Sequence, residues 1–400
     1  MFAHIDADAF FASALQRRRP DLKGKPLLAL GMGGGCVIAA SYEAKAFGVK
    51  TGMRLSEAKK LCPKAIAIPS DFEEALLASR QIETILGNRC PLIEQYSIDE
   101  WFLDLRTLPG GTPANLEHYL RELQKTVGAS VGLTISIGAG PSKLLAKMAS
   151  EYRKPAGVTI ISPPVLSIDD FLRDRTAATI PGIGPRRQLL STAHGWTTAY
   201  DIAHADSVLI KKLLGEPGVD MQRELLGEAL TGINENPAPP KSVSRCRSFP
   251  SSKDREMVYG HLLHHLTYTM LKMRREGLAC RMVSVWMRDH EYRHRGYTMK
   301  LPLPVDTEEQ ALPYIEKCFA RLWENGLRCT QTGLALLDLN PKGGTQFSLF
   351  EAPKKTEGAE KVQTALDVLH SKYGRGVIGR GAAMNTAGAG KKKLSVAEAI

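Results

Sequence analysis

Three carboxylates lie in apolar, strand-like segments of the sequence, and their residue types suggest a metal site. Asp6 lies in HIDADAF, while Asp99 and Glu100 are neighbours in YSIDEWFLDL. Buried Asp and Glu residues are uncommon on strands unless they are paired or bind a metal. Carboxylates brought together from two strands would form an oxygen-rich site for Mg²⁺, and two such ions support in-line phosphoryl transfer. The residues alone equally allow these acids to cap turns or to pair with surface lysines.

The neighbouring pair Asp99 and Glu100 requires a bend in the chain. Side chains of adjacent residues in a regular strand point to opposite faces, so one carboxylate would enter the core as an uncompensated charge. We therefore predict two strand segments that meet near Asp99. Asp8 and Asp104 lie on the same segments as the other acids. Spacing alone does not say which of these carboxylates is a ligand.

The elements that must position these residues alternate between strands and helices over the first part of the chain, which is typical of an α/β or α+β domain. We expect a buried strand over 1–10. We expect helices over 72–89 and 112–130, the second with Thr112 as N-cap and Pro113 in its first turn. The sequence therefore predicts a layered domain around the carboxylates.

Two further regions follow this domain. A helical region begins at AATIPGIGPRR, and the Asn/Pro-rich linker NENPAPPKS precedes a third region. Residues 241–340 combine a helix over 254–276 with alternating segments, which predicts a small sheet backed by helices. From Gly343 onward the composition is loose, and we expect a weakly ordered tail.

The charge distribution favours a nucleic-acid partner. The 400-residue chain has a formal net charge of +11, and residues 241–300 hold 13 Lys and Arg against 5 Asp and Glu. An excess concentrated in one stretch fits a polyanion better than it fits general solubility. Seven scattered cysteines without C-x-x-C spacing predict neither a disulfide framework nor a zinc site. No apolar run approaches ~18 residues and no signal-peptide pattern is present, so we expect a cytoplasmic protein without a membrane segment.

Five motifs occur in a fixed order: HIDADAFFAS, GCVIAASYEAKAFGVKTGM, EQYSIDEWFLDL, GAGPSKLLAKMASEYRKPAG and IPGIGPRR. Together they resemble the bacterial Y-family translesion DNA polymerases of the DinB/UmuC group, from residue 1 to about residue 350. RPDLKGKP and CRSF look closer to UmuC, and SEYRKPAGV looks closer to DinB. The subgroup therefore stays open.

The resemblance implies an α+β multidomain fold, that of a right-hand polymerase. Its parts would be a palm of mixed sheet and helices, small fingers, a helical thumb with a helix-hairpin-helix, and an α/β little finger. The expected boundaries are palm 1–10 and 72–165, fingers 11–71, thumb 166–235, little finger 241–342, and a flexible tail over 343–400 with a clamp-binding motif.

The resemblance also implies a two-metal centre. By motif matching, two Mg²⁺ ions would be held by the catalytic residues Asp6, Asp99 and Glu100 and by the backbone carbonyl of Ala7. Asp99 and Glu100 should then lie at or beside a hairpin turn, with Asp6 on the adjacent strand. Asp8 and Asp104 keep a structural role, and Asp104 should lie away from the cluster.

Nucleotide-binding positions follow from the same resemblance. Phe10 and Phe11 both belong to this set. Phe11, five residues after Asp6, would be the steric gate that excludes a 2′-hydroxyl, and Phe10 is the one of the two rings that we assign to the core. Tyr42 would donate its hydroxyl to a phosphate oxygen. Lys45 and Lys154 would face the triphosphate, although both residue types are more often solvated on a surface. Lys45 replaces the Arg of DinB-like members and loses its bidentate fork.

The resemblance extends to the DNA and to partner proteins. The PGIG loop resembles a helix-hairpin-helix, in which glycines let backbone N–H groups approach a DNA phosphate. The expected DNA-binding residues are Gly182, Gly184, Arg186, Arg187, Lys241, Arg245 and Arg247. TQFSLF resembles the bacterial sliding-clamp motif, with Gln346, Leu349 and Phe350 as anchors.

The implied function is error-prone, template-directed DNA synthesis from dNTPs on a primer-template during damage tolerance. Accessory repair subunits remain a possible requirement. A catalytically inactive relative that acts as a scaffold for clamp and DNA is the main alternative. A nucleotidyl cyclase on a related palm is the other, although residues 160–345 would have no role in it.

Overall fold

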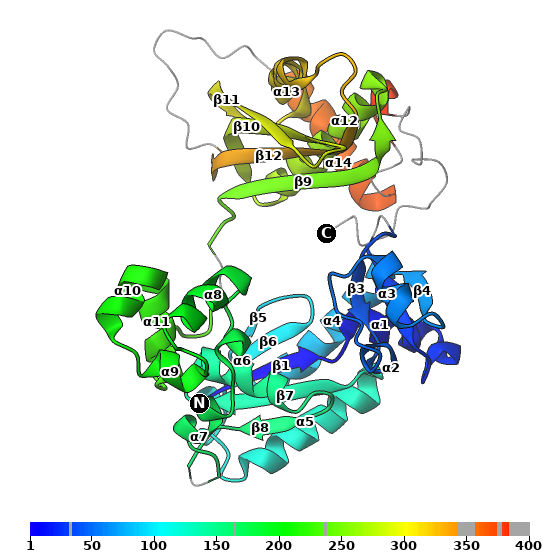
Figure 1. Cartoon of the computed structure of the whole chain (residues 1–400). Coiled ribbons are helices and arrows are strands. Elements are labelled where there is room, and N and C mark those ends of the chain that lie inside the picture. The colour runs from blue at the N-terminus through cyan, green and yellow to red at the C-terminus, as the bar shows by residue number, and fades with distance from the viewer. Residues whose placement is uncertain (32–33, 164, 236–237, 343–356, 374–377, 384–400) are drawn as a thin grey trace. The chain divides into compact units, whose positions relative to one another are not determined.

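The computed structural model describes residues 1–31, 34–163, 165–235, 238–342, 357–373 and 378–383 (Figure 1). The chain divides into two compact units, Met1–Pro237 and Ala238–Ile400. We describe each unit separately.

The first unit is built on a five-stranded sheet in the order β5-β6-β1-β7-β8. β1 lies at its centre and pairs antiparallel with β6 and β7, while β7 and β8 are parallel (Figure 1). The central strands β1 and β7 are buried on both faces, as expected of a sheet covered by helices. The strands are β1 (Phe2–Ala7), β5 (Ile93–Gln95), β6 (Glu100–Asp104), β7 (Ile135–Gly140) and β8 (Val158–Ile160).

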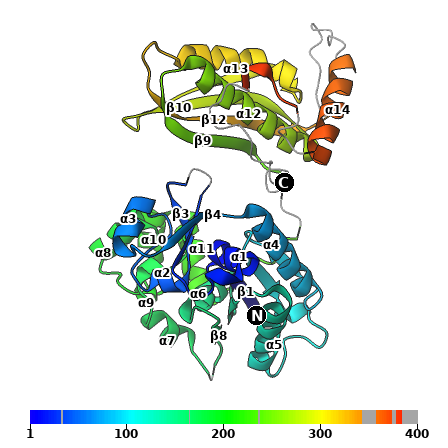
Figure 2. The same cartoon turned by 90° about the vertical axis from the view of Figure 1, so that its right-hand side faces the viewer.

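Helices cover both faces of this sheet. α4 (Phe72–Gly87) and α5 (Leu116–Val131) lie side by side (Figure 2) and share an apolar core with Ile5 of β1 and Trp101 of β6. α6 (Lys143–Tyr152) packs against β1 and β7 on the opposite face. That face carries the alternate residues of β1. It therefore holds the polar side chains of the central strand.

A glycine allows α6 to approach the sheet closely. A Cβ atom at Gly138 of β7 would lie 2.1 Å from the carbonyl oxygen of Ala146 and 2.2 Å from the amide nitrogen of Ser150. Such contacts are far inside van der Waals separation, so only glycine fits here. The close approach brings the residues of α6 within reach of β1.

A smaller three-stranded sheet, in the order β3-β2-β4, belongs to the same unit and lies beside one end of the larger sheet (Figure 1). α1 contributes to the cores of both sheets, with Phe10 and Ala14 in one and Ala12 and Leu15 in the other. The elements here are α1 (Phe10–Arg18), η1 (Pro20–Leu22), β2 (Leu27–Leu30), β3 (Val37–Ala40), α2 (Tyr42–Lys45), α3 (Leu55–Leu61) and β4 (Ile66–Pro69).

The unit ends in a group of short helices with their own apolar core, which includes Phe171 and Trp196 and extends to Leu145 and Met148 of α6. These elements are α7 (Ile168–Arg173), η3 (Ala177–Thr179), α8 (Pro185–Ala193), α9 (Ala199–Ala203), α10 (Ser207–Leu214) and α11 (Glu216–Leu225). The short helix η2 (Leu105–Thr107) follows β6 instead, and its Leu105 belongs to the core of the five-stranded sheet.

The second unit contains a four-stranded antiparallel sheet in the order β11-β10-β12-β9. Two helices cover one face and bury a core that includes Leu262 and Phe319. This arrangement confirms the predicted small sheet backed by helices. The elements are β9 (Ser242–Ser252), α12 (Arg255–Arg275), β10 (Leu278–Asp289), β11 (His294–Val305), α13 (Glu308–Leu322) and β12 (Cys329–Pro341).

The expectation of a flexible tail over 343–400 is wrong for part of that range. Residues Glu357–Tyr373 form α14, and Gly381–Ala383 form the short helix η4 against α12. Arg274 of α12 donates two hydrogen bonds to Asp367, at 2.6 and 2.7 Å, and Gln363 accepts from the amide of Glu308. Among the described side chains of α14, the buried ones are the polar Gln363 and His370, whereas Val362 and Val368 are 60% exposed, so the apolar residues of its sequence do not mark the docked face.

One helix begins later than the sequence predicts. α5 begins at Leu116 with Asn115 as its N-cap, because the Asn115 side chain accepts from the amide of His118 at 3.0 Å. Thr112 and Pro113 lie before the helix. Asn is at least as good an N-cap as Thr, and the helix begins after Asn115 instead of after Thr112. Among the described helices none is long and apolar enough to cross a membrane.

Candidate active site

Asp6 and Glu100 face each other across two strands. They are directly paired residues of the antiparallel strands β1 and β6, so their side chains project from the same face of the sheet, the face that α6 covers. Asp99 lies in the turn before β6, where the amides of Tyr96 and Ser97 donate to the carbonyl of Glu100. The predicted hairpin beside Asp99, with Asp6 on the adjacent strand, is confirmed.

The backbone brings Ala7 to the same place. The amide of Ala7 donates to the carbonyl oxygen of Asp99 at 2.9 Å, which ties the end of β1 to the turn. The Asp99 carboxylate accepts from the Ser97 hydroxyl. All the residues predicted to bind metal, Asp6, Ala7, Asp99 and Glu100, therefore meet at one end of β1.

Two lysines accompany the carboxylates on this face. The Lys154 ammonium lies 2.7 Å from Oδ1 of Asp6, and the Lys147 ammonium contacts Oε1 of Glu100. Burial raises the pKa of Asp6 to about 7 in spite of the opposing charge of Lys154. The pKa of Lys154 is raised, because Asp6 and Glu151 together outweigh its burial. The protein thus offsets only part of the free-energy cost of burying the negative charge of Asp6.

The donor set fits a hard divalent cation. Carboxylate and carbonyl oxygens are the ligands that Mg²⁺ prefers, and a cation here would favour the ionised form of Asp6, whose pKa is raised. In the described part of the chain no three His, Cys, Asp or Glu side chains are already arranged around one metal position. Asp6 and Glu100 are each held by a lysine instead. A metal ion that binds the same carboxylate oxygen atoms would have to displace these lysines.

The two rival carboxylates have structural partners. Asp8 accepts from the Ser136 hydroxyl at 2.8 Å, the amide of Ala156 at 2.9 Å and the Tyr42 hydroxyl at 3.2 Å. Asp104 lies at the far end of β6, opposite Phe2. Its carboxylate accepts from the Arg106 guanidinium at 2.6 and 2.8 Å, and these bonds lower its pKa. Asp104 therefore lies away from the cluster, as predicted.

The residues predicted to bind the triphosphate lie beside this cluster. Tyr42 and Lys45 are both on α2, and the Lys45 ammonium lies 4.4 Å from the centre of the Tyr42 ring. Burial and the charge of Lys154 lower the pKa of Lys45. The Tyr42 hydroxyl is engaged by Asp8, and burial raises its pKa. Tyr42, Lys45 and Lys154 thus form a basic edge on the carboxylate site.

The two phenylalanines at the start of α1 have different surroundings. Phe10 is 3% exposed and lies in the core. Phe11 is half-buried and packs edge-on against Phe10 at 5.5 Å and Phe72 at 5.3 Å. The burial of Phe10 agrees with its assignment to the core, and Phe11 is the ring of the two that could meet a sugar.

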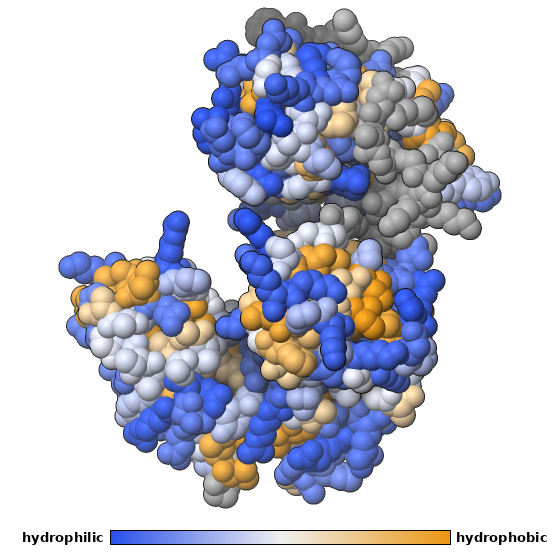
Figure 3. All heavy atoms as spheres, turned by 45° about the vertical axis from the view of Figure 1, so that its right-hand side comes forward, coloured by the Kyte–Doolittle hydropathy of each residue, from blue (hydrophilic) through white to orange (hydrophobic). Residues whose placement is uncertain are grey.

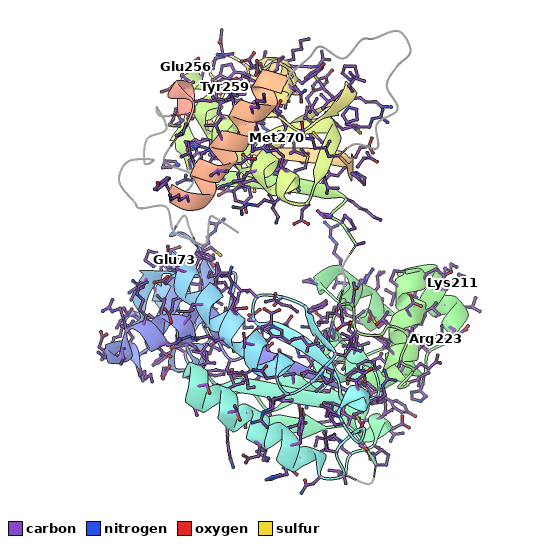
Figure 4. All side chains as sticks on the ribbon, turned by 180° about the vertical axis from the view of Figure 1, so that it is seen from behind. Glu73, Lys211, Arg223, Glu256, Tyr259 and Met270 are labelled. Carbon is purple, nitrogen blue, oxygen red and sulfur yellow. The ribbon has the colours of Figure 1, made fainter. Side chains whose placement is uncertain are left out.

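The glycine loop precedes α8. Gly182 has φ +96°, a conformation that favours glycine, and Gly184 is the N-cap of α8. Arg186 is exposed, whereas Arg187 folds back and donates to the Gly182 carbonyl at 3.0 Å. Two other cations of the short helices are paired: Lys211 of α10 contacts Glu216, and Arg223 of α11 contacts Glu228 (both cations are labelled in Figure 4).

The predicted DNA-binding arginines of the second unit lie on edge strand β9. Arg245 and Arg247 share a face with Val243, which is buried under the helices. The Arg245 guanidinium lies 4.2 Å from the centre of the Tyr268 ring on α12, while Arg247 and Lys241 are exposed. Figure 3 shows mostly hydrophilic residues on the described face of this unit turned to the viewer. The clamp-motif residues Gln346, Leu349 and Phe350 lie outside the described residues.

Sequence reasoning missed Lys147 and His4. His4 is fully buried on β1, and its ring lies 4.6 Å from that of Phe102. Burial and the nearby lysines, Lys147 first, hold its pKa well below its usual value. Two signals in the sequence indicate them. His4 lies two residues before Asp6 and so shares its face of the strand, and Lys147 lies in the motif GAGPSKLLAKMASEYRKPAG together with Lys154.

Comparisons with known proteins agree with this geometry. Residues 5–151 match the impB/mucB/samB family, and residues 240–349 match the impB/mucB/samB family C-terminal domain. The chain is 31% identical over 396 residues to DNA polymerase IV of Moorella thermoacetica, which covers 96% of each chain. It is 30% identical to Protein SamB of Salmonella typhimurium, covering 96% of this chain and 94% of that protein.

Solved structures share the fold. A Y-family DNA polymerase chimera, Dbh-Dpo4(243-245)-Dbh, superposes with a TM-score of 0.73 at 22% identity, over 85% of this chain and 99% of that one. DinB from Sulfolobus solfataricus gives a TM-score of 0.57 at 23% identity, over 85% and 99%. The α+β fold of right-hand Y-family polymerases is therefore the fold of this chain. The chain belongs to the impB/mucB/samB family, within the bacterial DinB/UmuC group of Y-family polymerases.

Proposed function

We propose that this chain is a DNA-directed DNA polymerase that performs error-prone translesion synthesis. It would join the α-phosphate of a dNTP to the 3′-hydroxyl of a primer, with release of pyrophosphate. The observation that carries the proposal is the cross-strand pairing of Asp6 with Glu100 beside the Asp99 turn. Family membership supports it, because the relative from Moorella thermoacetica is named DNA polymerase IV.

Some of the site residues would bind the metal ions, and the others would bind the nucleotide. Asp6, the Ala7 carbonyl, Asp99 and Glu100 would hold two Mg²⁺ ions, which supply activation of the primer hydroxyl and neutralisation of the leaving pyrophosphate. Lys45 and Lys154 would neutralise the triphosphate as point charges. Tyr42 would exchange its bond to Asp8 for a phosphate oxygen. Phe11 would select the deoxyribose by steric exclusion.

The rest of the chain would hold the template and the partners. We propose a palm (1–10, 72–165), fingers (11–71), a thumb (166–235) and a little finger (241–342). Gly182 and Gly184 would offer backbone amides to a DNA phosphate, with Arg186 beside them, and Lys241, Arg245 and Arg247 would contact the backbone of the template. Such contacts position DNA without reading sequence, which suits a polymerase that must accept damaged templates. Gln346, Leu349 and Phe350 would bind the sliding clamp.

Primer extension with and without Mg²⁺ tests the proposed function. The wild-type protein should extend a primer only with a divalent cation, on undamaged and lesion-bearing templates. Asp99→Ala should abolish extension while primer-template binding in a gel shift stays near wild type. Asp104→Asn is the matched control, because Asp104 lies on the same hairpin but is bound to Arg106, and it should retain extension. An Asp99→Ala protein that extends primers normally would refute the site.

A further inference from the structure

Lys147 of α6 contacts one of the proposed metal ligands directly. Its ammonium bonds Oε1 of Glu100 and lies 5.0 Å from the centre of the Tyr96 ring, which follows β5. Both members of the pair are largely buried, with side chains 19% and 16% exposed. A pair so sheltered is screened less by solvent than a surface pair. The contact therefore holds the Glu100 carboxylate in one position.

The hydrogen bonds of His4 leave Glu100 dependent on this lysine. Ser150 donates its only hydroxyl hydrogen to the carbonyl of Lys147 at 2.8 Å, so it must accept from Nδ1 of His4, also at 2.8 Å. The neutral ring then carries its proton on Nδ1 and a lone pair on Nε2. Nε2 lies 3.8 Å from Oε1 of Glu100 and has no hydrogen-bond partner. The Nε2 lone pair of His4 and the Oε1 atom of Glu100 are therefore two acceptors that face each other. Among the described residues, Lys147 is the donor that bonds the Glu100 carboxylate.

The same hydrogen bonds fix the position of the Lys147 backbone. The His4–Ser150 bond ties α6 to the central strand, and the bond from Ser150 to the Lys147 carbonyl connects that anchor to the lysine. Gly138 permits the close approach of the helix, as described above. The ammonium is thus delivered by a rigid element rather than by a mobile loop. Rigid delivery is what a positioning group requires.

We propose that Lys147 is a positioning residue that occupies the Glu100 carboxylate until the metal ions arrive, and that His4 and Ser150 hold it there. The inference rests on the proposed function, because it takes Glu100 as a metal ligand. A cation on Glu100 offsets the repulsion among Asp6, Asp99 and Glu100 in the metal-free protein. It would also compete with a metal ion for the Glu100 carboxylate. The protein should therefore bind the metal weakly until nucleotide phosphates add ligands.

Mn²⁺ titration of the protein without DNA tests this, by calorimetry or by the loss of the free-ion resonance signal. Lys147→Met removes the competing charge, so Mn²⁺ affinity should rise about three- to tenfold. Lys147→Arg keeps the charge and should bind Mn²⁺ like wild type. Added dNTP should increase Mn²⁺ affinity less in Lys147→Met than in the wild type. In this variant no lysine competes with Mn²⁺ for Glu100, so the nucleotide has less competition to offset.

Lys143→Met is the matched control. Lys143 lies one turn earlier on α6 and bonds Glu94 at 2.7 Å, a carboxylate that belongs to no proposed metal site. Its loss should cost similar thermal stability and leave Mn²⁺ affinity unchanged. Unchanged or weaker Mn²⁺ binding in Lys147→Met would overturn the inference and leave Lys147 a structural ion pair. If Lys147→Met does not fold, Lys147→Gln must show the same gain in affinity.

A double-variant cycle tests the role of the anchor. Ser150→Ala removes the acceptor for His4 and should raise Mn²⁺ affinity less than Lys147→Met does. The combined variant should bind Mn²⁺ no more tightly than Lys147→Met alone, because both changes act through one contact. Full additivity would refute the connection. Failure of the wild-type protein to extend primers would refute the proposed function instead, and the metal titrations would not depend on it.

Discussion

The ammonium of Lys154 lies 2.7 Å from Oδ1 of Asp6, and yet burial still raises the pKa of that carboxyl to about 7. One lysine therefore does not fully compensate the buried charge. A buried carboxylate whose pKa stays raised beside a lysine would be stabilised further by a divalent cation. The same relationship makes the stability of the metal-free protein depend on pH in a defined direction.

The first prediction concerns that pH dependence. A carboxyl whose folded pKa is raised from 3.8 to about 7 holds its proton longer when folded, so its contribution to stability is present at low pH and is lost as pH rises from about 4 to about 7. Asp6→Asn removes this loss. In EDTA, its free energy of unfolding relative to wild type should rise by about 1–3 kcal/mol between about pH 4 and pH 8. Urea unfolding at several pH values measures it.

Asp104→Asn should show the opposite sign. Hydrogen bonds from Arg106 lower the pKa of Asp104, so its contribution is present above the unfolded pKa and is lost as pH falls through the lower folded value. This variant should be less stable than wild type at neutral pH, and the difference should shrink under acid conditions. Parallel pH profiles for the two variants would contradict both assignments.

The second prediction concerns sugar selection by Phe11. Phe11→Ala should increase incorporation of rNTPs relative to dNTPs, because the ring that would block the 2′-hydroxyl is removed. Each loss of about 1.4 kcal/mol in discrimination corresponds to about a tenfold change in the ratio of kcat/KM values. Single-nucleotide insertion kinetics provide the measurement. Phe10→Leu is the control: Phe10 is core, so stability should fall while sugar selection is retained.

The third prediction tests the docking of α6. Gly138→Ala would place a methyl group 2.1 Å from the Ala146 carbonyl oxygen, which forces the helix from the sheet. We expect a loss of about 3 kcal/mol in the free energy of unfolding and reduced primer extension. Gly128→Ala, in α5, meets nothing closer than 3.9 Å and should stabilise the protein by about 0.5–1 kcal/mol. Equal effects at both glycines would show that the close approach is unimportant.

The fourth prediction concerns the clamp motif. Deletion of residues 345–350 should abolish the stimulation of synthesis by a sliding clamp and spare synthesis without it, because the proposed motif would insert apolar side chains into a pocket on the clamp. Primer extension with and without clamp measures both. A matched loss of basal synthesis would point to a structural role for these residues.

Local sequence patterns determined much of the fold and part of the site. The adjacent acids Asp99 and Glu100 predict a break between two strand segments, because two neighbouring carboxylates cannot share one face of a regular strand. Apolar periodicity predicts the helices near 72–89 and 254–276, which the structure has at Phe72–Gly87 and Arg255–Arg275. The ordered motifs identify the family. Each of these signals depends on residues close together in the chain.

Only the tertiary structure decided which residues meet across long separations. The β1–β6 register, rather than any local pattern, places Asp6 opposite Glu100 and Asp104 at the other end. Helix docking brings Lys147 to Glu100. The ion pair between Arg274 and Asp367 holds α14 against α12, although the composition of this stretch predicts no ordered structure. Periodicity marks which face of an element is apolar, but the partner of a buried polar group depends on strand register and helix packing. Those are set by the whole core.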